Sequence, residues 1–127
     1  MIKMVIQGNP TTKKNSQSII YRAGRPMIIP SAKYSEYEHM AGYYLSHKGD
    51  KLKGPLEITC IFYRDSKRRC DLTNLLEAID DILVKYGVIS DDDYKTIVSH
   101  DGSRVYVDRD NPRTEIYIRE LDDEQWV

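Results

Sequence analysis

One segment with a helical repeat constrains the fold of this chain more than any other. Its apolar residues recur every three or four positions, which predicts an amphipathic helix. They are Leu75, Leu76, Ile79, Ile82, Leu83 and Tyr86. Gly87 follows at the position where a glycine commonly ends a helix. The segment must therefore bury one stripe against other elements.

The other side of this helix is polar. At 100° per residue, with Asn74 set at zero, the apolar side chains cover an arc from about 80° to 200°. The arc from about 300° to 20° holds Asn74, Glu77, Asp81 and Lys85. Asp71 and Thr73 lie at the N-terminal entrance. The helix is therefore expected to present an Asn-Glu-Asp face.

Strands are expected on both sides of the helix. The clearest covers residues 56–63, because alternate apolar residues there would share one face. These residues are Leu56, Ile58, Cys60 and Phe62. Other strand-like runs cover 2–7, 18–22, 26–29, 95–100, 103–108 and 114–119. The Asp101-Gly102 pair predicts a type I′ hairpin between residues 95–100 and 103–108.

A second helix is predicted after Pro30, with Ser31 as its N-cap. Aromatic and apolar residues in it recur at helical spacing: Tyr34, Tyr37, Met40, Ala41 and Tyr44. The tyrosines could stack on nucleic-acid bases, but their spacing favours packing in the core.

This order of elements predicts an α+β fold, with a mixed or largely antiparallel sheet flanked by helices. The 127 residues contain no internal repeat or linker, so we expect a single domain over residues 1–127. No run approaches the roughly 20 apolar residues that a membrane span requires. The N-terminus lacks the apolar core of a signal peptide, which favours a cytoplasmic protein.

The charges divide along the sequence. Residues 1–69 hold 13 Lys and Arg against 5 Asp and Glu, whereas residues 70–127 hold 6 against 15. This division suits a metal-using enzyme that acts on a polyanion, because phosphate attraction and cation binding need opposite fields. The alternative is a chance sorting of solvated charges.

Several other chemistries find no support in the sequence. Cys60 and Cys70 match no zinc spacing. His39, His47 and His100 form no HxxxH or HxH pair. The acidic run at residues 91–93 lacks the spacing of an EF-hand, and no phosphate-binding GxxxxGK loop is present. No Ser-His-Asp or Cys-His arrangement stands out either.

Two acidic clusters bracket the amphipathic helix. Asp71 comes just before it, and Asp91-Asp92-Asp93 follows it. The clusters can meet only if the chain folds back, and we expect Val88-Ile89 to rejoin the sheet beside residues 56–63. Converging carboxylates need a cation between them, and oxygen ligands favour Mg²⁺ or Mn²⁺. The alternative is an N-cap at Asp71 and a solvated acidic turn.

Basic residues that could contact phosphates lie mainly upstream of the helix. They are Lys13, Lys14, Arg22, Arg25, Lys33, Lys67, Arg68 and Arg69. The run Lys67-Arg68-Arg69 is the most informative, because it places cations directly before Asp71. A substrate phosphate bound there would lie beside a metal ion. The alternative is a solubilising loop.

A resemblance to the RusA family of Holliday-junction resolvases lies in the segment Arg68-Arg69-Cys70-Asp71-Leu72-Thr73-Asn74-Leu75, together with Asp81, Gly87 and Asp91-Asp92. That family carries an Arg-rich run, then Asp-Leu-Asp-Asn-Leu, a lysine further along the helix, an aspartate in mid-helix, and Gly followed by Asp-Asp. Near the N-terminus, Gly8-Asn9-Pro10 and Lys13-Lys14 are similar to the family's opening. The likeness spans most of the chain.

The resemblance implies a homodimer with a basic cleft and Mg²⁺-dependent nicking of two strands across a four-way junction. By position, Asp71 matches the first motif aspartate, and Asp91 and Asp92 match the later pair. Asn74 and Asp81 match the helix positions. The DNA-binding residues expected on these grounds are Lys13, Lys14, Lys67, Arg68, Arg69 and Asn74.

Two positions depart from the family pattern. Thr73 stands where the family has its second catalytic aspartate, and Glu77 stands where it has an essential lysine. Because Thr73 and Glu77 are an i, i+4 pair, we predict that Glu77 supplies the missing carboxylate as a catalytic, metal-binding residue. The lost lysine leaves Arg69 or a second metal ion to stabilise charge in the transition state.

Three functions are open at this point. The leading one is a Mg²⁺-dependent, structure-selective endonuclease, in which Asp71 and Asp92 orient an attacking water toward the phosphodiester of branched DNA. The second is a catalytically weak junction-binding protein of the same fold, which Thr73 and Glu77 favour. The third is a small interaction protein with acidic loops, for which no salt-dependent affinity for DNA is expected.

Overall fold

A mixed β-sheet organises the part of the chain that the computed structural model describes, namely residues 1–13, 17–30, 32–45 and 49–122. Its strands are β1 (Ile2–Gln7), β4 (Leu56–Arg64), β5 (Ile97–Ser99), β6 (Arg104–Val107) and β7 (Arg113–Glu120). β7 lies between β1 and β4 and runs antiparallel to both. β5 and β6 both pair with the other edge of β4 and run parallel to it.

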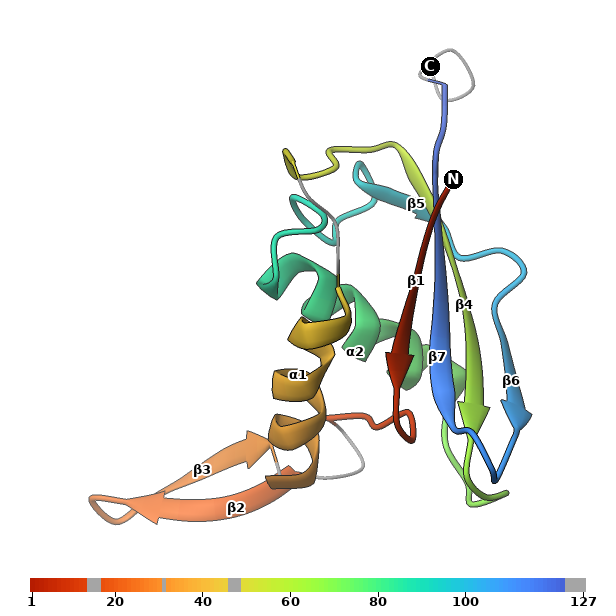
Figure 1. Ribbon diagram of the computed structural model, residues 1–127. Coiled ribbons are helices and arrows are strands. Elements are labelled where there is room, and N and C mark those ends of the chain that lie inside the picture. The colour runs from red at the N-terminus through yellow and green to blue at the C-terminus, as the bar shows by residue number, and fades with distance from the viewer. Residues whose placement is uncertain (14–16, 31, 46–48, 123–127) are drawn as a thin grey trace.

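Two helices, α1 (Ala32–Tyr44) and α2 (Leu72–Lys85), lie on the same side of this sheet (Figure 1). The alternation along β4 explains this arrangement, because its four predicted inward residues are fully buried while those between them are partly exposed. The helical repeat in α2 buries Leu75, Ile79, Ile82 and Leu83 against the same core. The predicted α+β class is confirmed. Neither described helix is long and apolar enough to span a membrane.

α1 packs with only part of its predicted face. Tyr34, Tyr37 and Ala41 are buried, and the Tyr37 hydroxyl shares a hydrogen bond of 3.2 Å with the Thr114 hydroxyl of β7. Tyr44 remains 37% exposed, so the expected core packing is confirmed for the first two tyrosines and wrong for the third. The predicted N-cap, Ser31, lies outside the described residues.

A two-stranded hairpin projects from the rest of the molecule (Figure 1). It comprises β2 (Gln17–Arg22) and β3 (Arg25–Pro30), which cover the strand-like runs predicted at 18–22 and 26–29. Its turn residues, Ala23 and Gly24, both have positive φ angles, which is typical of a type I′ turn. Ile19, Tyr21 and Ile28 of the hairpin are 65%, 72% and 68% exposed, and none of them belongs to the hydrophobic core.

The hairpin predicted between residues 95–100 and 103–108 is wrong. β5 and β6 do not pair with each other but follow one another along the same edge of β4. The turn between them is bonded to β4, because the Thr59 hydroxyl donates to the Asp101 carbonyl (2.8 Å) and the Cys60 N–H donates to the Ser103 hydroxyl (3.0 Å). β5 and β6 therefore act as two parts of one interrupted strand along β4, and the turn between them is bonded to the same edge.

The expected return of Val88-Ile89 to the sheet beside residues 56–63 is also wrong. Ile89 instead forms a parallel bridge with Leu52, which precedes β4. The Leu52 N–H donates to the Val88 carbonyl (3.0 Å), and the Ser90 N–H donates to the Leu52 carbonyl (2.9 Å). Val88 and Ile89 are nevertheless buried. The chain pairs with β4 only further along, through β5. The acidic loop at residues 91–93 therefore lies between these two anchor points.

Candidate functional site

An open groove of about 310 Å³ lies beside α2 and is lined by residues from three segments. α2 contributes Thr73, Glu77 and Asp80, which share one face because they are spaced by four and three residues. The loop after α2 contributes Asp92, and the turn after β5 contributes His100. Of the predicted metal-binding residues, the groove brings together Glu77 and Asp92. Asp71 and Asp91 are not among its lining residues.

Asp80 and His100 form a partly buried pair that sequence reasoning missed. His100 Nε2 lies 2.9 Å from Asp80 Oδ2, and Nδ1 lies 2.7 Å from the Ile58 carbonyl oxygen of β4. Because that carbonyl can only accept a hydrogen bond, Nδ1 carries a proton. Asp80 Oδ1 is buried and has no hydrogen-bond partner. The pair therefore joins α2 to the sheet and leaves one carboxylate oxygen unsatisfied beside the groove.

The pKa of each member of this pair lies above its ordinary value. Burial raises the pKa of Asp80, the negative charges of Asp81 and Glu77 add to this, and His100 opposes it. Burial alone would lower the pKa of His100, but the hydrogen bond and charge of Asp80, with the Ile58 carbonyl, outweigh burial and raise it. The folded protein thus holds a proton at this pair more tightly than the unfolded chain does.

We expect the stability of the protein to fall as the pH rises above 6.5, the ordinary pKa of histidine. A raised pKa in the folded state contributes stability below 6.5, and that contribution is lost as the pH passes through the folded-state pKa. The His100→Gln variant should show a flatter profile over the same range. Urea unfolding at several values between pH 6 and 9 would measure this, and parallel profiles for the two proteins would contradict it.

The acidic run after α2 divides into different roles. The Asp92 N–H donates to Asp91 Oδ1 (2.7 Å), and both side chains are exposed. Partial desolvation, a side-chain hydrogen bond with Asp91 and the charge of Asp81 raise the pKa of Asp92. Asp93 acts structurally, because its Oδ1 accepts the N–H of Thr96 at 3.0 Å. The interpretation as a turn therefore holds for Asp93, whereas Asp92 faces the groove.

Asp71 occupies the N-cap position of α2 without capping it. Its backbone is extended and its side chain makes no cap hydrogen bond. The nearest side-chain interaction is a long one, in which Asn74 Nδ2 donates to Asp71 Oδ2 at 3.4 Å. The Asp71 carboxylate is exposed to solvent. It is thus available for a role other than capping.

The carboxylates at the groove are the type of ligand that a hard cation prefers, although the described residues do not already form a metal site. Within residues 1–13, 17–30, 32–45 and 49–122, no three His, Cys, Asp or Glu side chains form a cluster ready to hold a metal ion. Burial is the main cause of the raised pKa of Asp80 and of Asp92, and the negative charges of neighbouring carboxylates add to it. A divalent cation bound in the groove would relieve this repulsion.

Lys13 reaches the acidic face of α2 from the loop after β1. Its Nζ lies 3.3 Å from Asp81 Oδ2 and 5.7 Å from the centre of the Tyr34 ring. A shallow cleft there is lined by Lys13, Asn74, Glu77, Ala78 and Asp81. This contact joins segments 68 residues apart, so no local pattern predicts it. The neighbouring predicted residue, Lys14, lies outside the described residues.

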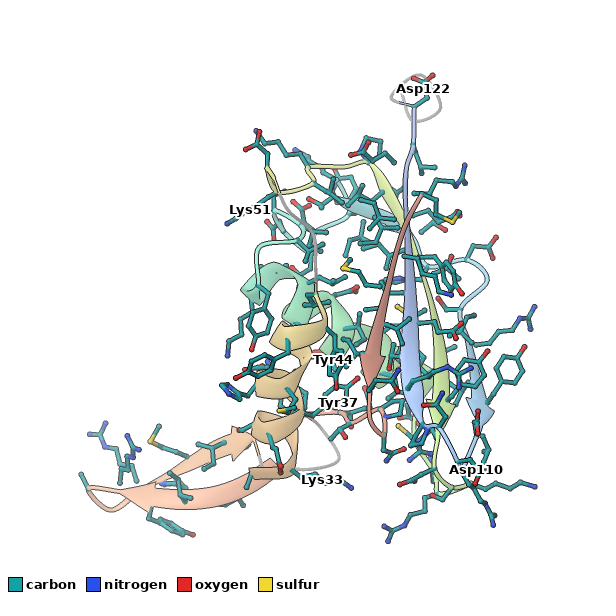
Figure 2. All side chains as sticks on the ribbon, in the orientation of Figure 1. Lys33, Tyr37, Tyr44, Lys51, Asp110 and Asp122 are labelled. Atoms are coloured by element: carbon teal, nitrogen blue, oxygen red, sulfur yellow. The ribbon has the colours of Figure 1, made fainter. Side chains whose placement is uncertain are left out.

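A basic cavity of about 430 Å³ lies next to the start of α2. The predicted residues Arg68 and Arg69 line it together with Lys33, which extends from the first turn of α1 (Figure 2), and Arg64, which sequence reasoning missed. Lys67 is exposed on the same loop but does not line the cavity. Basic and acidic regions therefore meet at the N-terminal end of α2.

A known protein family matches most of the chain. The family model described as endodeoxyribonuclease RusA matches residues 7–119. This span includes α2, the groove and the basic cavity. No curated protein is significantly similar to the chain in sequence.

Proposed function

The chain belongs to the RusA endodeoxyribonuclease family, and from this premise we propose that it is a Mg²⁺-dependent, structure-selective endonuclease. It would resolve Holliday junctions or other branched DNA by paired phosphodiester hydrolysis, acting as a homodimer. One observation carries the proposal: a groove with Glu77, Asp80 and Asp92 lies along the same helix whose N-terminal end adjoins a basic cavity. This arrangement attracts a polyanion and a divalent cation to neighbouring places.

The residues proposed to hold Mg²⁺, or Mn²⁺ in its place, are Asp71, Asp91, Asp92 and Glu77. When bound, such an ion polarises a phosphodiester and lowers the pKa of water. Asp71 and Asp92 would orient the attacking water, since both are exposed at the surface that the substrate must approach. The DNA contacts proposed are Lys13, Lys14, Lys67, Arg68, Arg69 and Asn74.

Lys13 supports a further assignment within this proposal. The family has a lysine where this chain has Glu77, and Lys13 lines the same shallow cleft as Glu77. Its ammonium group therefore brings a positive charge to that part of the helix from another segment. We assign to Lys13, rather than to Arg69, the stabilisation of negative charge that develops on the phosphate.

The test is cleavage of an end-labelled four-way junction, with a linear duplex of the same sequence as the control substrate. We expect the junction, but not the duplex, to be nicked in Mg²⁺ and to stay intact in EDTA. A second function, a catalytically weak junction-binding protein, is favoured by Thr73 and by the lack of a preformed metal cluster among the described residues. Binding in EDTA with no nicking in Mg²⁺ or Mn²⁺ would support that function instead.

The replacement of the lost carboxylate by Glu77 gives a separate prediction. Glu77→Gln should lower Mg²⁺-dependent cleavage by about 100-fold, the order expected when one electrostatic contributor to a reacting centre is removed. The matched control is Glu36→Gln on the exposed side of α1, which should leave the rate unchanged. Adding Thr73→Asp to Glu77→Gln should restore much of the rate. Undiminished cleavage by Glu77→Gln would sink the idea.

A further inference from the structure

We propose that the basic cavity at the start of α2 is a discrete pocket for one backbone phosphate of a DNA strand, built by Arg64 and Lys33 together with Arg68 and Arg69. The inference rests on the proposed function, because DNA is taken as the substrate. It adds an anchoring site and two residues, Arg64 and Lys33, that the family pattern did not single out as DNA contacts.

Cations from three separate parts of the chain converge on this cavity. Lys33 comes from α1, Arg64 from the last residue of β4, and Arg68 and Arg69 from the loop before α2. Among the described residues that line the cavity, Asp65 is the one acidic side chain, so four positive charges there face one negative charge. Such convergence concentrates positive potential in a concave place, where it acts on an anion more strongly than scattered surface charges do.

The walls of the cavity are held by hydrogen bonds before any ligand binds. Asn9 Oδ1 accepts the N–H of Asp65 at 2.9 Å, and the Thr11 hydroxyl donates to the Asn9 carbonyl at 2.9 Å. A guanidinium N–H of Arg64 donates to the carbonyl of Arg68. The first of these bonds joins the loop after β1 to the loop after β4, and the other two fix the conformation on each side. The pocket is thus preorganised, which lowers the entropic cost of binding.

One donor in the pocket lacks a partner. The Nε atom of Arg64 is buried and makes no hydrogen bond. A buried donor without a partner costs free energy, and a donor on a cation is best satisfied by an anionic oxygen. A bound anion would satisfy this donor once the Arg64 side chain turned toward the pocket, because the Nε atom itself is shielded from solvent.

The lining suits a backbone phosphate of DNA and not a stacked base. It contains arginine, lysine, threonine, serine and asparagine side chains but no aromatic ring on which a base could stack. Cys70 closes the lining at the residue before Asp71. A strand anchored here would pass directly to Asp71 and then to the acidic groove along α2. The pocket would therefore set which phosphate reaches the groove.

The experiment measures junction binding in EDTA over a series of KCl concentrations. Each phosphate contact contributes about 0.9 to the slope of log K against log salt. Both protomers of the proposed homodimer carry the change, so the double variant Lys33→Gln/Arg64→Gln should reduce that slope by about 0.9 per protomer, because both residues serve one phosphate. Lys3→Gln, at the opposite end of β1 from Asn9, is the matched control and should leave the slope unchanged.

A titration with inorganic phosphate, followed by the amide NMR signals of Asn9 and Asp65, should show binding that the double variant loses.

Two results would overturn the pocket. An unchanged slope would show that these residues contact no phosphate, and a reduction of about 1.8 per protomer would show two independent contacts. Because Arg64 also bonds to the Arg68 carbonyl, the double variant could lose binding by misfolding. Lys33→Gln alone leaves that bond intact and should still weaken phosphate binding.

Binding in EDTA is independent of cleavage. If wild type cleaves junctions but the slope does not change, only the pocket fails; if the slope changes but nothing is cleaved, only the nuclease proposal fails.

Discussion

Cleavage of a four-way junction in Mg²⁺ is expected to fall by about 100-fold or more when Asp71 is replaced by Asn. The substitution keeps the shape of the side chain and removes its charge. Since the Asp71 side chain makes no cap hydrogen bond, the stability of α2 should change little. Single-turnover cleavage of a labelled junction, together with binding in EDTA and thermal unfolding, would separate an effect on catalysis from one on folding. Asp92→Asn should behave in the same way.

Asp93→Asn provides the matched control in the same acidic run. Its carboxylate accepts the N–H of Thr96, so its substitution should lower stability slightly and leave the chemical step unaffected. Equal cleavage by wild type and Asp71→Asn would overturn the assignment of Asp71 to the site. A loss of cleavage in Asp93→Asn as large as that in Asp71→Asn would show that the acidic loop responds as a whole.

Gly54→Ala is expected to destabilise the protein by about 3 kcal/mol or more. Gly54 has a φ of +87°, and a Cβ there would lie 2.6 Å from the Thr96 carbonyl oxygen and 2.8 Å from that of Lys95. Both obstacles are backbone atoms, which cannot move aside as a flexible side chain can. Residues 95 and 96 lead from the acidic loop into β5, so the damage should reach Asp91 and Asp92. Urea unfolding would measure the loss.

Gly8→Ala is the control for the backbone contribution. Gly8 also has a positive φ, of +111°, but a Cβ there would have no atom within 4 Å. Its substitution should therefore cost only the strain of the backbone, about 1–2 kcal/mol. Equal losses in the two variants would show that the contact of Gly54 with residues 95 and 96 contributes nothing.

Local patterns were sufficient to predict α2 and the buried face of β4. The spacing of apolar residues indicates directly which side of a helix or strand is buried. Gly87 has the positive φ expected of a glycine that follows a helix. The order of β5 and β6 could not be read in this way. Asp101-Gly102 has the composition of a hairpin turn, but the unpaired edge of β4 competes for both strands and bonds the turn as well. That competition depends on a strand some 40 residues away.

The positions of some groove residues could be predicted in the same way, whereas their role in binding metal stays a prediction. Thr73 and Glu77, spaced as i and i+4, line one groove together with Asp92. Asp80 carried a usable signal, because it lies three residues after Glu77 and seven after Thr73. Its angle on the helix falls between the apolar and polar arcs, which is where a half-buried acid belongs. His100 carried no local signal, since its partners, Asp80 and the Ile58 carbonyl, come from two other segments.

The projecting β2–β3 hairpin has a consequence for how such a protein can diversify. Its apolar residues Ile19, Tyr21 and Ile28 lie outside the core, so substitutions among them remove little packing from the body of the molecule. Selection can therefore alter the arm without first unfolding the sheet, the groove or the cavity. Among relatives, we expect the length and sequence of this hairpin to vary more than the rest of the chain. Related proteins would then differ in what the hairpin contacts while they keep the same chemistry.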